Sequence, residues 1–78
     1  MQKIYFVRAE WDDEARVWVA TSDDVPGLVT EADTLESLSV KLEALIPELL
    51  DLNGFPNGEE VPFELLASKF SVTQRNLH

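Results

Sequence analysis

Carboxylates are concentrated in one stretch of this sequence, between Ser22 and Glu36. This stretch contains no lysine, arginine or histidine. It contains five carboxylates: Asp23, Asp24, Glu31, Asp33 and Glu36. Clustered carboxylates are typical of two-metal nucleases and of general acid–base catalysis. Such chemistry requires carboxylates that converge and are withdrawn from water. The spacing here favours solvated positions, so a vestigial or metal-dependent nuclease-like domain using this acidic loop is an alternative and not the leading hypothesis.

The first two carboxylates of the stretch precede a predicted turn. Asp23 and Asp24 are followed by Val25, and aspartate commonly forms hydrogen bonds with nearby turn backbone. Pro26 presets φ for the first central position of a type II turn, and Gly27 accepts the positive φ of the second. A Pro-Gly turn accounts for this loop without an active site.

The later carboxylates mark the start of a helix. With Asp33 as the N-cap, Glu36 completes a capping box; with Thr34 as the N-cap, Glu36 still favours the positive end of the helix. Apolar residues then recur at intervals of three and four, forming one stripe: Leu35, Leu38, Leu42, Leu45, Ile46 and Leu49. Pro47 predicts a bend within this helix, and the Asn-Gly pair at 53–54 predicts its end.

Other catalytic chemistry has little support in the sequence. The chain has no cysteine, and its one histidine is the last residue, His78. The serines therefore have no histidine partner in an ordered element, as a catalytic triad requires. The three glycines do not form a phosphate-binding loop. We predict a protein that is not an enzyme and that uses no metal or cofactor.

The composition indicates one small acidic domain. The chain has 78 residues and a formal net charge of −9. We expect an ordered core over about residues 2–72 and a frayed tail over 73–78. The charge disfavours direct binding to nucleic acid or to an anionic membrane. No signal peptide or membrane span is evident, so we expect a cytoplasmic protein. A core this small commonly gains support from association, so we predict a homodimer or higher oligomer, formed through a strand edge or an uncovered sheet face.

Alternating side chains predict the strands. Residues 3–11 place one set of side chains on one face (Tyr5, Val7, Ala9, Trp11) and a second set on the other (Ile4, Phe6, Arg8, Glu10). Residues 16–21 are β-branched and aromatic, which indicates an antiparallel hairpin with residues 3–11. A short third strand is expected at 28–31. Residues 61–72 fit either a strand or a short helix, and their period of two favours a strand.

These elements predict an α+β fold in the order β-β-β-α-β, in two layers, with an antiparallel sheet and one helix on one face. One helix leaves the second face of the sheet uncovered. Part of an aromatic and apolar set therefore stays exposed: Ile4, Tyr5, Phe6, Trp11 and Trp18. Such a patch on a small domain usually marks an interface, which favours a binding role.

The segment from Trp18 to Glu36 resembles the HicB-like antitoxin family in its hairpin strand, acidic residues, Pro-Gly turn, short strand and Asp-Thr-Leu-Glu helix start. Residues 47–54 and 62–65 resemble in particular a short single-domain branch of uncharacterised bacterial proteins. The resemblance implies a partial ribonuclease H-like fold that binds and blocks a small basic RNA-cleaving toxin (HicA-like) of a type II toxin-antitoxin system. Many members of the family carry a C-terminal DNA-binding segment, which this sequence does not match.

The leading hypothesis is therefore a non-catalytic, antitoxin-like neutraliser. The residues predicted to contact the partner are Asp23, Asp24, Glu31, Trp11 and Trp18. A plain oligomerisation module with an unknown partner is the second alternative.

Overall fold

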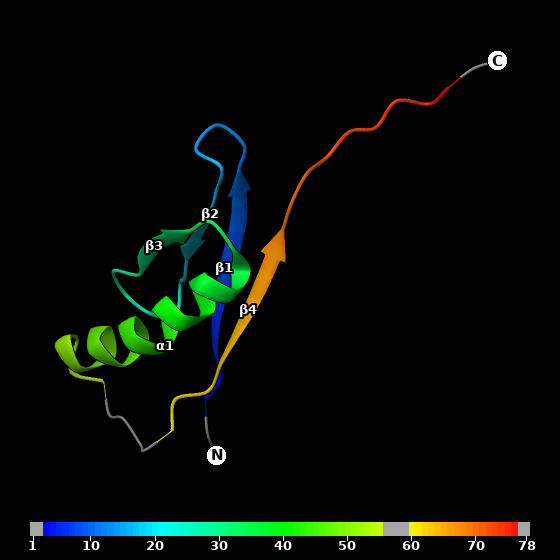
Figure 1. Cartoon of the computed structure of the whole chain (residues 1–78). Helices are drawn as coiled ribbons and strands as arrows, with labels where there is room; N and C mark the ends of the chain where they lie inside the picture. Colours follow the sequence, from blue (N-terminus) through cyan, green and yellow to red (C-terminus); the bar gives the residue numbers. More distant parts are fainter. Residues whose placement is uncertain (1–2, 56–59, 77–78) are drawn as a thin grey trace.

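In the part of the chain that the structure describes, one helix lies across one face of a four-stranded sheet (Figure 1). The computed structural model describes residues 3–55 and 60–76. Its elements are β1 (Tyr5–Asp12), β2 (Val17–Thr21), β3 (Val29–Ala32), α1 (Leu35–Leu52) and β4 (Phe63–Ser68). The predicted α+β class and the order β-β-β-α-β are confirmed. The predicted ordered core (2–72), the predicted tail (73–78) and His78 lie partly or wholly outside the described residues.

The sheet is mixed, so the prediction of a purely antiparallel sheet is wrong. Its strand order is β3-β2-β1-β4. The β1–β2 and β2–β3 pairs are antiparallel, whereas β4 runs parallel to β1, with Tyr5 opposite Phe63. The cause is the connection through α1. The helix returns the chain to the end of the sheet at which β3 and β1 begin, so that β4 must run in their direction.

Residues 61–72 form a shorter strand than predicted. The ladder with β1 ends at the pair Glu10 and Ser68, and residues 69–76 continue without a strand partner in the described chain. Since β1 itself ends at Asp12, where the hairpin turn begins, residues 71 and 72 have no residue of β1 opposite them in this register. The strand alternative is confirmed for Phe63–Ser68 and is wrong for residues 69–72.

The core lies between α1 and one face of the sheet. Val7 and Ala9 are buried, while Ile4 and Phe6 on the opposite parity are each 49% exposed, which confirms the predicted faces of β1. The helix buries its apolar stripe along its whole length: Leu38, Leu42, Ile46 and Leu50. Leu50 lies outside the predicted stripe. The helix passes through Pro47 as one element, as predicted.

Both ends of α1 are capped. Thr34 is the N-cap, since its side-chain oxygen accepts a hydrogen bond from the Ser37 N–H at 3.0 Å. The alternative with Asp33 as N-cap is therefore wrong. At the other end Gly54 has a φ of 72°, and the N–H of Phe55 donates to the carbonyl of Leu50 at 3.0 Å. This pattern ends the helix where the Asn-Gly pair predicts.

Candidate functional site

The Pro-Gly turn is attached to the end of the helix. Gly27 has a φ of 83°, and the Leu28 N–H donates to the Val25 carbonyl at 3.2 Å, as a type II turn requires. The Asn53 side-chain amide donates to the Pro26 carbonyl at 3.3 Å and to a carbonyl of its own helix. Val25 and Leu28 are buried on either side of the turn. The turn is therefore part of the folded core.

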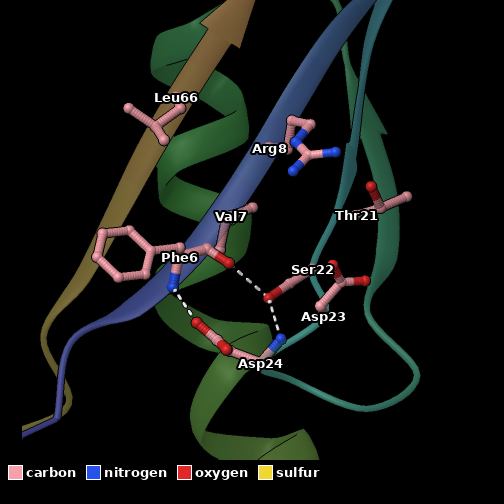
Figure 2. A pocket seen from close by; sticks show the side chains of 8 residues that line it. All are labelled: Phe6, Val7, Arg8, Thr21, Ser22, Asp23, Asp24 and Leu66. Carbon is pink, nitrogen blue, oxygen red and sulfur yellow. Dashed lines mark hydrogen bonds between the residues drawn. The ribbon is translucent and has the colours of Figure 1, made fainter.

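Asp24 and Ser22 extend the hydrogen bonding of β1 beyond the end of β2 (Figure 2). The Phe6 N–H donates to Asp24 Oδ2 at 2.8 Å, and Ser22 Oγ donates to the Phe6 carbonyl at 2.6 Å. The same Ser22 oxygen accepts the N–H groups of Asp24 and Val25 at 3.0 and 3.2 Å. The Asp24 and Ser22 side chains thus make the hydrogen bonds to Phe6 that the backbone of a further β2 residue would make. The structure thus gives Asp24, a predicted partner contact, a clear structural role.

An open pocket of about 200 Å³ lies beside this arrangement. It is lined by residues of β1, β2, β4 and the acidic loop: Phe6, Val7, Arg8, Thr21, Ser22, Asp23, Asp24 and Leu66. In Figure 2, Phe6 and Leu66 lie on its left, and Arg8, Thr21 and Asp23 lie on its right. Within residues 3–55 and 60–76, Asp23 and Arg8 form no hydrogen bond through their side chains and no ion pair. The pocket therefore offers an apolar wall and two available charges of opposite sign.

The two tryptophans form a separate cluster. Their rings lie 5.3 Å apart in an edge-to-face arrangement, because Trp11 and Trp18 are directly opposite in the hairpin. The Arg16 guanidinium lies 5.3 Å and Lys69 Nζ lies 5.0 Å from the centre of the Trp11 ring. By the parity of β1 these rings are on the helix side of the sheet, away from Asp23.

The predicted contact residues are therefore not brought together in one site. Trp11 and Trp18 lie on the helix side at the hairpin end, while Asp23 and Asp24 border the pocket on the uncovered face. Glu31 is exposed on β3, on the uncovered face, opposite Val19. Sequence reasoning did not assign Arg8 or Leu66 to a site. For Arg8 the available signal was its parity with Phe6 on the same strand, whereas the assignment of Leu66 required the parallel pairing of β4 with β1.

The described carboxylates do not form a metal site. Among residues 3–55 and 60–76, no three or more His, Cys, Asp or Glu side chains are grouped so as to hold a metal ion. In the same part of the chain, no helix is long and apolar enough to cross a membrane.

Titration with Mn²⁺ or Mg²⁺ is accordingly expected to give only the heat of dilution. Asp24 is engaged with the Phe6 N–H, and the neighbouring exposed carboxylates do not converge. Isothermal calorimetry of the wild-type chain and of Asp23→Asn should give the same trace. Saturable binding tighter than about 100 µM that Asp23→Asn abolishes would contradict this prediction and favour the nuclease-like alternative.

Comparisons with other proteins place the chain among relatives without an assigned activity. The model of a family described as "Domain of unknown function (DUF1902)" matches residues 4–75. Among solved structures, the chain is similar to the hypothetical protein TTHA1013 from the extremely thermophilic bacterium Thermus thermophilus, with 49% identity and a TM-score of 0.71. That match covers 94% of this chain and 100% of the other. No curated protein matches the chain at a significant level.

Proposed function

This chain belongs to the DUF1902 family, and we propose that it is a non-catalytic cytoplasmic binding protein, an antitoxin-like neutraliser that covers the active surface of a small basic RNA-cleaving toxin. The observation that carries the proposal is the uncovered face of the sheet. We call the side chains that point away from α1 the open face: Ile4, Phe6, Arg8, Glu10, Asp12, Val17, Val19, Thr21, Val29, Glu31, Glu64, Leu66 and Ser68.

The open face has the composition of a protein-binding surface. Three apolar side chains of this face are each about half exposed: Ile4 just before β1, Phe6 on β1 and Leu66 on the neighbouring β4. Glu10 and Glu64 belong to the same face, and Asp23 borders it at the pocket. An apolar centre with a polar rim is the usual anatomy of a protein interface. The apolar centre supplies contact area, and the acidic rim sets the preferred charge of the partner.

The charge of the chain favours a basic partner. A net charge of −9 on 78 residues attracts a positively charged protein over a distance of several ångströms and accelerates association. Asp23 is exposed at the pocket and makes no side-chain bond to the described residues, so its carboxylate is available to a lysine or arginine. Arg8 lies in the same pocket, and a partner carboxylate opposite its guanidinium would fix the orientation of binding.

The proposal is tested by recovering the partner and assaying it. A tagged copy of this chain, expressed from its native locus, is expected to copurify with a small basic protein that cleaves RNA when separated from the chain. Adding the purified chain back should inhibit that cleavage at a stoichiometric ratio. Copurification of no basic protein, or of one whose RNA cleavage the chain leaves unchanged, would contradict the proposal.

A charge reversal at the pocket is expected to weaken this complex. The Asp23→Lys variant should raise the dissociation constant for the basic partner about tenfold or more, because it replaces an attraction with a repulsion at the contact. Glu43→Lys makes the same change of net charge on an exposed position of α1 and should alter the constant less than about threefold. Calorimetry at fixed ionic strength measures both. Equal weakening by the two variants would show that net charge, and not the open face, determines binding.

A further inference from the structure

The two edges of the sheet differ in how they are protected. The β3 edge is only four residues long, and Lys41 Nζ from α1 donates to the Glu31 carbonyl at 2.6 Å. A short strand and a lysine are features that prevent an edge from pairing with another chain. The β4 edge is six residues long, and no described residue pairs with its outer side. Its unpaired backbone groups are therefore open to a further strand.

The segment that follows β4 continues this edge away from the domain. Residues 69–76 run outward from β4 as an extended chain (Figure 1), and all of them are exposed. Phe70 is 89% and Val72 is 73% exposed. Both have the same parity as Leu66, which is 52% exposed on the open face of β4. The extended segment thus presents an apolar row at the spacing of a strand but without a neighbour to cover it.

We propose that residues 64–76 pair antiparallel with the same segment of a second copy, with the two-fold axis at Phe70, so that two four-stranded sheets become one sheet of eight strands. In this arrangement each extended segment lies along the β4 edge of the other copy. Leu66 is opposite Gln74, Ser68 is opposite Val72, and the two Phe70 side chains face each other.

The register follows from parity and charge. A continuous sheet requires opposing residues to lie on the same face, so that the numbers of each opposed pair must add to an even total. Pairing as much as possible of residues 63–76 then requires an axis near the middle of this segment, at Lys69 (pairing 63–75) or at Phe70 (pairing 64–76). An axis at Lys69 would place two lysines directly opposite each other, which is destabilising. An axis at Phe70 instead pairs two aromatic side chains, which is stabilising.

A second copy is the occupant whose side chains match this edge. Residues 65–76 contain two basic residues, Lys69 and Arg75, and no acidic residue, although the chain as a whole has a net charge of −9. In the proposed register Lys69 is opposite Ser71 and Arg75 is opposite Leu65 of the second copy, so that no like charges are directly opposed along the paired edges. Lys69 keeps its position beside Trp11, since its side chain points to the helix side and not to the strand edge. The pairing also leaves the open face uncovered in both copies.

The chain contains no cysteine, so single introduced thiols can test the register. Under mild oxidation, Phe70→Cys is expected to form a disulfide-linked dimer at least about tenfold faster than Leu52→Cys, because pairing raises the local thiol concentration. Leu52 is a matched control at the far end of α1, where it is 81% exposed. Light scattering of the wild-type chain should give twice its 8.8 kDa mass.

A second pair of variants covers the case in which removal of the Phe70 ring weakens the dimer. A mixture of Lys69→Cys and Ser71→Cys chains should form the mixed disulfide in preference to either homodimer, since residues 69 and 71 are opposite in the proposed register. A monomeric wild-type chain at about 100 µM, a scale at which a specific dimer should associate, would overturn the proposal. A dimer in which neither pair links faster than Leu52→Cys would overturn it as well.

Discussion

The Leu42→Ala variant is expected to lose about 2–5 kcal/mol of the free energy of unfolding. Leu42 is fully buried at the middle of α1, where it packs against the sheet between Leu38 and Ile46. Its truncation removes buried apolar surface and leaves a cavity in the small core between α1 and the sheet. Since domains of this kind have total stabilities of about 5–15 kcal/mol, the loss is a large part of the whole.

Urea unfolding followed by circular dichroism measures this loss, with Leu52→Ala as the control. Leu52 is the same residue type on the same helix but is 81% exposed, so its truncation should change stability by less than about 0.5 kcal/mol. Similar losses in the two variants would contradict the described orientation of α1.

The Asp24→Ala variant is expected to lose about 1–2 kcal/mol, because the Phe6 N–H then has no acceptor and the loop no longer continues the sheet. The hydrogen bond lies where β2 has ended, and no other described group accepts from that N–H. Asp24→Asn keeps a side-chain oxygen at the same position and should retain part of the stability.

Asp23→Ala is the matched control for this prediction. Its carboxylate is exposed and makes no bond to the described residues, so its removal should leave the free energy of unfolding within about 0.5 kcal/mol of wild type. Chemical denaturation of the three variants under one set of conditions gives the comparison. A loss in Asp23→Ala equal to that in Asp24→Ala would mean that the acidic loop contributes through its charge and not through the Phe6 bond.

The sequence was sufficient for features that depend on local periodicity. The alternation of residues 3–11 correctly separated the buried Val7 and Ala9 from the exposed Phe6. The three-and-four spacing in α1 identified Leu38, Leu42 and Ile46 as core residues. Proline and glycine at 26–27 identified the turn because their backbone preferences are intrinsic to the residue types.

The direction of β4 could not be predicted in the same way. The side-chain pattern of a strand is identical whether its neighbour runs parallel or antiparallel. What decides the direction is the path of α1 over the sheet, which is a property of the whole chain. The assignment of Leu66 to the open face next to Phe6 depends on that path.

The structural role of Asp24 could also not be predicted from its neighbours in the sequence. Its partner, the Phe6 N–H, is 18 residues away in the chain, so the sequence of the turn alone could not identify it. The contact of Trp11 with Trp18 is different, because it follows from the hairpin. A loop centred between residues 14 and 15 places these two residues opposite each other, and this signal was present in the sequence.

The parallel pairing of β1 with β4 determines the order in which the protein can be completed during translation. Tyr5 is made long before its strand partner Phe63. The hairpin, β3 and α1 have local contacts and can form early, whereas β1 and β4 are far apart in the chain, so that their pairing forms late and slowly. One edge of β1 therefore stays unpaired on the ribosome until β4 has emerged.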